Sequence, residues 1–282
     1  MSIDKRRMKV CIALFAACMT SAHSAAAATL QPQTVRGWEE YIDAAERRIN
    51  REVHQGPGFL VLDFKPAEEK ARIRKLLEDG RVHVEKMRAE DARGKKIQAD
   101  DGMIHHWYGS VLIPGATLET VIPWVQSYDR HSEYFPEVEK SKLLSRNGES
   151  FTIFLRLVRK KVVTVHYNTE HRVVYRHRSP SQISSQSVAS RIAEVSGAGT
   201  AAEKEKSSAD DSGFLWRLNS YWRFEQTDAG VLVECESISL SRSIPLGLGW
   251  LVRPFVESVP RESLNNMLAA IRDGVVHDSP KI

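Results

Sequence analysis

The segment LGWLVRPFVESVPRESLNNMLAAIRDGVV, residues 248–276, decides the fold that we expect for this chain. Its apolar residues recur at helical spacing and form one continuous stripe: Leu251, Val252, Phe255, Val259, Leu264, Met267, Leu268, Ile271 and Val275. Pro254 and Pro260 are expected to bend or break the first half of this helix. A helix with so long a stripe must bury it against another layer of the structure.

The residues before this helix supply that layer, because they show the period of two that is typical of strands. We expect strands at 104–113, 151–158, 162–176, 183–195, 214–226 and 231–242, and a helix at 117–128. The turn Asp228-Ala229-Gly230 joins the last two strands in a hairpin. Helices gathered on one side of an antiparallel sheet define an α+β fold. A long helix across a strongly curved sheet leaves a hollow in which a small ligand can bind.

Two helices are predicted ahead of the first strand. The first, at 36–53, is amphipathic and stops at Gly56-Pro57-Gly58, and the second runs from Pro66 to Glu78. We therefore divide the chain into a leader at 1–28, an N-terminal helical extension at 29–79 and a ligand-binding domain at 80–278. The stretch 197–212 is rich in Gly, Ala, Ser, Glu and Lys, and we expect a flexible insertion there.

The first 28 residues have the pattern of a secretory signal peptide. A cationic run, Lys5-Arg6-Arg7-Met8-Lys9, precedes an apolar run from Val10 to Met19 and a series of small residues from Ser21 to Ala28. The apolar run is shorter than the roughly 20 residues that a membrane span needs. We expect a periplasmic or secreted protein. The alternatives are a short anchor that stays attached and a lipoprotein modified at Cys18.

Charge and cysteine content narrow the classes of function. The whole chain carries +4, and the leader carries +3 (four Lys and Arg against Asp4), which leaves about +1 for the rest. So small a charge does not favour nucleic acid as a partner. Cys235 alone lies outside the leader, so no disulfide is expected and the core must stabilise the fold.

The motifs of metal, nucleotide and hydrolase chemistry are missing from the sequence. His166 and His171 point to opposite faces of one predicted strand, and no histidine pair has the spacing of a zinc site. There is no P-loop, no dinucleotide fingerprint and no Gly-x-Ser-x-Gly elbow. We predict no metal and no cofactor.

Three stretches carry a resemblance to a known superfamily. They are SYDRHSEYFPEV at 127–138, SYWRFE at 220–225 with Gly230-Val231 and Glu234-Cys235-Glu236 after it, and Leu240-Ser241-Arg242-Ser243-Ile244-Pro245 before the closing helix. From Gly80 to Asp278 the chain resembles the START-like, or helix-grip, superfamily, which includes the polyketide cyclase/dehydrase-like proteins. The resemblance implies a curved antiparallel sheet wrapped on the long C-terminal helix. It also implies a cavity for lipids or other apolar molecules, with catalysis in some members. A shared fold does not by itself fix the function.

Alternation along the strands suggests which side chains line the cavity. The odd-numbered residues of strand 162–176 are mostly apolar with a few polar tips, so we assign them to the concave face. The predicted ligand-binding residues are Tyr167, Thr169, His171, Tyr175, Trp222, Arg223, Glu236, Leu251, Phe255 and Met267. Arg223 is expected to pair with Glu234 or Glu236. A buried pair would orient a ligand headgroup, and an exposed pair would be a surface contact of little energy.

Three hypotheses follow for the function. The first is an exported binder or carrier of a lipid or another hydrophobic small molecule, with the closing helix as its gate. The second is a cyclase- or dehydratase-type enzyme in the same cavity, with Tyr167, His171, Tyr175 and Arg223 as acid-base groups. The third is an interaction protein with a filled core. The run Arg159-Lys160-Lys161 is a solvated turn or a transient contact with anionic lipid headgroups. The oligomeric state is not predicted.

Overall fold

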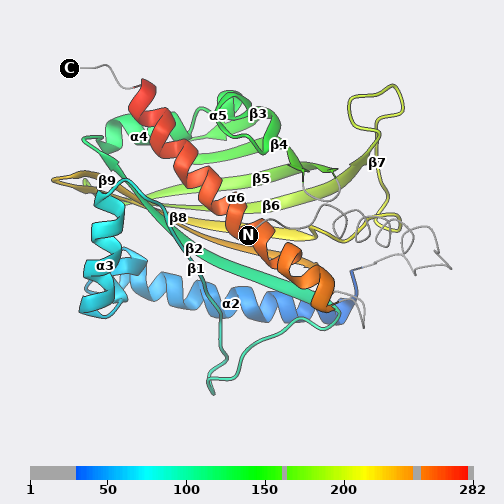
Figure 1. The fold of residues 1–282 in the computed structure, drawn as a ribbon, viewed down its shortest axis with the longest axis horizontal. Coiled ribbons are helices and arrows are strands. Elements are labelled where there is room, and N and C mark those ends of the chain that lie inside the picture. Colours follow the sequence, from blue (N-terminus) through cyan, green and yellow to red (C-terminus); the bar gives the residue numbers. More distant parts are fainter. Residues whose placement is uncertain (1–29, 161–163, 244–248, 279–282) are drawn as a thin grey trace, which may run out of the picture.

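The computed structural model describes residues 30–160, 164–243 and 249–278, and for 249–257 it describes the helical backbone alone. The predicted leader at 1–28 lies outside the described residues. In Figure 1, α6 crosses the strands of one large sheet. Helix α2 packs on the other face of this sheet, where it bonds to β9, β8 and β6. Among the described helices none is long and apolar enough to cross a membrane.

The N-terminal helices form where the sequence predicts them. Helix α2 spans Pro32–His54, and its buried residues follow one face: Thr34, Trp38, Tyr41, Ala45, Ile49 and Val53. A proline at the first helical position fits there because its missing N–H would have no helical partner. A short 3-10 helix, η1, spans Val61–Phe64, and α3 spans Ala67–Glu78. Pro66 caps α3 and is not its first residue, which shifts the prediction by one position.

Within the described residues the sheet contains nine strands, and every pairing in it is antiparallel. Their bounds are β1 His83–Lys86, β2 Gly102–Pro114, β3 Val138–Asn147, β4 Ser150–Lys160, β5 Thr164–Ser179, β6 Gln182–Ser196, β7 Lys204–Glu205, β8 Arg217–Thr227 and β9 Gly230–Arg242. The order across the sheet is β1-β2-β9-β8-β6-β5-β4-β3, with β7 paired to β6. The described chain therefore has the α+β architecture that the sequence predicts.

The helices after β2 lie on one side of this sheet. Helix α4 spans Leu118–Val125, η2 spans Tyr128–Arg130, α5 spans His131–Tyr134 and α6 spans Gly249–Asp278. Buried Leu264, Leu268, Ile271 and Val275 confirm the second half of the predicted apolar stripe of α6. Of the bend or break predicted at Pro254 and Pro260, the break is wrong, because α6 continues through both prolines.

The sheet is bent so strongly that its two borders both reach α6. At the β2 border, a methyl group placed on Gly109 would lie 2.6 Å from Cδ1 of Leu268. At the opposite border, Arg159 at the end of β4 donates to Glu262 of α6 over 2.9 Å. The sheet thus wraps around the helix. Arg159 is no solvated turn residue, since it also pairs with Glu137.

Apolar residues cover both faces of the sheet. The inner face, which faces α6, carries a core that includes Val111, Trp124, Phe151, Phe224 and Leu268. The outer face carries a second core, in which side chains of α2, η1 and α3 pack on Leu112, Leu232, Ile238 and Leu240. The structure is therefore three layers deep: α6, sheet, and the N-terminal helices.

Two segments differ from the prediction. Strand β3 was not predicted, because it carries Lys140, Lys142 and Arg146 and lies at the border of the sheet, where charge replaces the apolar alternation. The predicted flexible insertion includes β7, and Glu203 and Glu205 within it bind Arg156 and Asn168 across 2.7 Å.

Candidate functional site

The strand register builds a polar row across the middle of the inner face. Ser187 of β6 lies opposite Ser220 of β8, and Ser220 lies opposite Ser237 of β9. Ser237 in turn pairs with Trp107 of β2. We call Ser187, Ser220 and Ser237 the serine row. Because side chains alternate along each strand, all of these residues point toward α6.

Solvent reaches this part of the inner face. The partly exposed residues there are Trp107, Ser187, Leu218, Ser220, Trp222 and Ser237, and we call them the inner-face band. By contrast, Phe224 and Val233, farther along the same strands, are 1% and 0% exposed. Trp107 and Trp222 of the band pack against the inner core, and part of their surface stays in contact with solvent.

Met267 of α6 points toward the inner face of the sheet. On α6, Leu264 and Leu268 pack on β2, while Asn266 reaches Glu137 beside β3 over 3.2 Å. Helical geometry places Met267 between these two directions, toward the middle of the sheet. Met267 is partly exposed, as the band is. Two of the predicted ligand-binding residues, Met267 and Trp222, thus lie on facing elements, and both pack against the inner core.

Two buried polar atoms at inward positions, Nε1 of Trp107 and Nε of Arg159, have no hydrogen-bond partner among the described residues. A buried polar group without a partner costs about 1–3 kcal/mol, so such groups are uncommon in a filled core. Trp107 belongs to the inner-face band, and Arg159 lies at the end of β4, where it reaches α6.

His171 lies beside the serine row with a defined tautomer. The hydroxyl of Thr169 donates to the carbonyl of Leu155, so its oxygen accepts the Nε2 proton of His171 over 3.0 Å. Nδ1 of His171 then accepts from the hydroxyl of Ser187 over 3.3 Å. Burial lowers the pKa of His171 to about 4. The imidazole is therefore neutral at pH 7, and its partners among the described side chains are the hydroxyls of Thr169 and Ser187.

The predicted residues of β5 all point to the inner face, as their alternation indicates. Tyr167, Thr169, His171 and Tyr175 are all buried there. The hydroxyl of Tyr175 is 3.0 Å from that of Tyr128, and burial raises the pKa of Tyr175 to about 12. Side chains of the protein thus already bind the polar tips of Thr169, His171 and Tyr175. The side chains of Leu251 and Phe255 lie outside the described residues.

Arg223 and Glu236 do not lie in the predicted cavity. They point to the outer face, beneath α2, because each is one residue away from an inner-face position in its strand. The prediction paired Arg223 correctly with Glu236, over 3.0 Å, and with side chains only 2% and 1% exposed. It was wrong to group this pair with Trp222, since adjacent residues of a strand face opposite ways.

A buried network surrounds this pair. Arg223 also donates to Glu52 over 2.6 Å and to the carbonyl of Phe59 over 2.8 Å, and Arg48 of α2 pairs with Glu236. Nε2 of His106 lies 3.1 Å from Glu236. Burial alone would raise the pKa of Glu236, but His106 and the two guanidinium groups outweigh it and hold the pKa well below its usual range. The network fastens the helical extension to the sheet.

Glu234 extends the network to the segment before α3. Its carboxylate accepts from the amides of Val61 and Leu62 over 2.6 and 3.1 Å, and from the hydroxyl of Tyr108 over 2.6 Å. Burial raises the pKa of Glu234 to about 7, although Arg223 and these donors oppose that shift. All four groups lie on the outer side, away from α6.

The wrapped helix, the strand order and the antiparallel pairing together define the architecture. The chain has a START-like, helix-grip fold. Similar solved structures include a STAR-related lipid transfer protein from Xanthomonas axonopodis, with 16% identity and a TM-score of 0.45, over 68% of this chain and 98% of that one. Others are the Zhui aromatase/cyclase from Streptomyces sp. R1128, with 13% identity and a TM-score of 0.43, over 62% and 95% of the two chains, and a human StarD13 lipid transfer and protein localization domain, with 9% identity and a TM-score of 0.43, over 77% and 100%. No family model and no curated sequence matches the chain.

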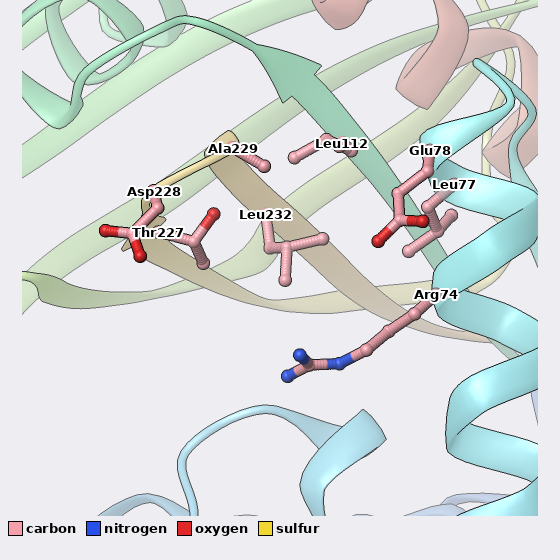
Figure 2. Close-up of a pocket in the computed structure, with 8 residues that line it drawn as sticks. All are labelled: Arg74, Leu77, Glu78, Leu112, Thr227, Asp228, Ala229 and Leu232. Atoms are coloured by element: carbon pink, nitrogen blue, oxygen red, sulfur yellow. The ribbon is translucent and has the colours of Figure 1, made fainter.

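A separate hollow of about 220 Å³ lies on the outer side of this START-like fold. Figure 2 shows Arg74 of α3 extending toward the β8–β9 turn, with Leu112 and Leu232 between them. Its volume is below the range of roughly 300–1,000 Å³ that is usual for ligand pockets. It lies away from α6 and from every residue predicted to bind the ligand.

The sequence prediction missed the serine row and Trp107. Their signal is present, since Ser185 and Ser187 alternate in β6, and Ser237, Ser239 and Ser241 alternate in β9. Small polar residues at inward positions of central strands are unusual in a packed core. The prediction followed the apolar residues of each strand and therefore did not weigh these serines.

Proposed function

We propose that the chain binds a hydrophobic small molecule or lipid against the inner-face band, beneath α6, and catalyses no reaction on it. The observation that carries the proposal is the partial exposure of Trp107 and Trp222 between the curved sheet and the helix. An apolar ligand that covers these rings would remove their surface from water, which is worth about 25 cal/mol per Å².

The surroundings of His171 support binding without catalysis. A dehydratase or cyclase needs titratable groups that exchange protons with the ligand. His171 is bonded to Thr169 and Ser187, and Tyr175 to Tyr128. Arg223, the remaining acid-base candidate, lies on the other face of the sheet. These contacts favour the carrier over the enzyme.

Native mass spectrometry of protein purified without detergent tests the proposal. We expect adducts in the mass range of lipids, or uptake of lipid from liposomes by the apo protein. In a palmitic acid titration, Trp222→Leu should weaken binding about tenfold, because it removes a ring from the band. Trp216→Leu is the matched control, since Trp216 packs on the outer core. An apo mass with no uptake from liposomes would contradict the proposal.

We further propose that the protein is exported and takes up its ligand at a membrane surface. The support is the cationic and apolar pattern of residues 1–28. N-terminal sequencing of the protein from the envelope fraction should begin after the run of small residues that ends at Ala28. A full-length protein retained with the cytoplasmic fraction would overturn export, and it would leave ligand binding untouched.

A further inference from the structure

The segment that joins β1 to β2 forms a loop whose base is fixed to α2. It covers residues 87–101, and Figure 1 shows it extending beyond α2, away from the body of the molecule. At the base, the amide of the buried Ala89 donates to the hydroxyl of Tyr41 on α2 over 2.9 Å. The returning limb lies so close to α2 that a methyl group on Gly37 would be 2.5 Å from the carbonyl oxygen of Gln98. The helix therefore holds the loop in its extended position.

The end of this loop is a tight turn that presents cations to solvent. The carboxylate of Asp91 accepts from the amides of Arg93 and Lys95 over 2.8 and 2.9 Å, and the backbones of Glu90 and Lys96 form a β-bridge. The side chains of Arg93, Lys95 and Lys96 are exposed, and we call these three residues the basic tip. None of them forms an ion pair with a residue that the structure describes. Their charges are thus available to a partner.

The net charge of the chain is divided unevenly between this loop and the rest. Residues 88–96 carry four Lys and Arg against Glu90 and Asp91, which gives a net charge of +2. Residues 29–282 together carry about +1, so the part outside the loop carries about −1 (+1 minus +2). An anionic surface therefore attracts the basic tip while it weakly repels the remainder. Such an uneven distribution orients a molecule as it approaches a charged surface.

We propose that the basic tip contacts an anionic lipid bilayer. The potential of such a surface falls off within about 10 Å, so cations must stand clear of the body to reach it, as this loop does. A nucleic acid fits less well, since a typical site neutralises more phosphates than three cations can. This inference rests on the proposed uptake of ligand at a membrane surface, and it names the part of the chain that makes the contact.

Co-sedimentation of the purified protein with vesicles tests the contact. One set of vesicles contains phosphatidylcholine and phosphatidylglycerol, and the other contains phosphatidylcholine alone. We expect the wild type to bind the anionic vesicles more tightly and to lose this preference at high salt, where charges are screened. Arg93→Gln/Lys95→Gln/Lys96→Gln should lower the partition coefficient on anionic vesicles roughly 100-fold, because three favourable charges are lost.

Lys142→Gln/Arg172→Gln/Arg176→Gln is the matched control, because it removes the same charge from exposed positions of β3 and β5. It should bind the anionic vesicles as the wild type does. Equal losses in the two triple variants would show that the basic tip has no special part in the contact. A wild type that ignores anionic vesicles, or that binds poly-glutamate in their place, would overturn the inference. Lipid adducts in native mass spectrometry would in that case still support the proposed ligand binding.

Discussion

At the scale of single residues, the outer face of the sheet buries a network of paired charges beneath α2, whereas the polar groups around His171 on the inner face are neutral. Arg223 and Glu236 lie under α2 in a network that supplies each with several partners. His171, on the inner face, is bonded to hydroxyl groups alone. The two faces therefore respond differently to substitution and to pH.

Removal of one buried partner should be costly on the outer face. Arg223→Met leaves Glu236 and Glu52 without one guanidinium and should lower the free energy of unfolding by about 3–5 kcal/mol. Arg172→Met, on the exposed side of β5, should change it by less than about 0.5 kcal/mol. Urea denaturation measures both values. Equal, small effects would mean that the network is not what holds α2 in place.

Acid should destabilise the protein in part through His171. The pKa of His171 is about 4 in the folded protein and 6.5 in the unfolded chain. The neutral imidazole therefore adds its full contribution to the free energy of unfolding above pH 6.5, and this contribution is lost as the pH falls toward 4. His171→Gln keeps both hydrogen bonds without a charge. Between pH 7 and 4.5 this variant should lose about 2 kcal/mol less than the wild type. Exposed His177→Gln is the control.

The pH experiment compares variants because Glu234 acts in the opposite direction. Its folded pKa of about 7 is above the usual 4.5, so its effect stabilises the fold as the pH falls from 7 to 4.5. A difference between wild type and His171→Gln isolates the histidine. If both lose the same free energy, His171 is not the group that titrates.

At the scale of elements, the contact between α6 and β2 depends on a glycine. The inner surface of β2 at Gly109 is flat enough for the side chains of Leu264 and Leu268 to lie against the backbone. A residue with a side chain would push the helix away from the strand. The close approach of α6 to the sheet therefore depends on the absence of a side chain at position 109.

Two substitutions at this contact should compensate for one another. Gly109→Ala places a methyl group 2.6 Å from Cδ1 of Leu268 and should cost about 1–3 kcal/mol by overpacking. Leu268→Ala should cost about 2–5 kcal/mol by leaving a cavity. The double variant should cost at least about 1 kcal/mol less than the sum, because the new methyl group enters the vacated space. Additive costs would show that the two side chains do not meet.

Sequence patterns predicted the elements well where one face of an element is apolar. The helix expected at 36–53 is α2, Pro32–His54, and the inward positions of β5 follow the expected alternation. Strand β3 was missed because it lies at the border of the sheet and most of its residues are polar and exposed, although Val138 and Leu143 pack on the inner core. The location of Arg223 was missed for another reason. Alternation along the strand places Arg223 and Trp222 on opposite faces of the sheet. No local sequence pattern, however, shows that α2 covers the outer face and buries Arg223.

At the scale of the whole molecule, the N-terminal extension completes the fold. The core on the outer face includes Trp38, Tyr41 and Ile49 of α2, together with Leu232 and Leu240 of β9. Without the extension, the sheet would expose this apolar surface and the charges of the buried network. The sheet and α6 therefore depend on residues that precede the first strand.

A fragment that begins at residue 80 tests this dependence. We expect it to be poorly soluble or loosely packed, with weak near-UV circular dichroism and strong binding of the dye ANS. Protein that begins at residue 30 is the control and should unfold cooperatively. A cooperative transition in the shorter fragment would show that residues 80–278 fold independently.

The pairing of β2 with β9 has a consequence for biosynthesis. The paired residues are separated by 116 positions at Pro114 and Gly230 and by 140 at Gly102 and Arg242. During translation β2 leaves the ribosome long before β9, its neighbour in the sheet, has been synthesised. The backbone N–H and C=O groups on that edge of β2 therefore have no strand partner until the chain is almost complete. Contacts so distant in sequence close slowly. The nascent polypeptide thus remains incompletely folded until synthesis is nearly over. A chaperone that binds it would act during that interval.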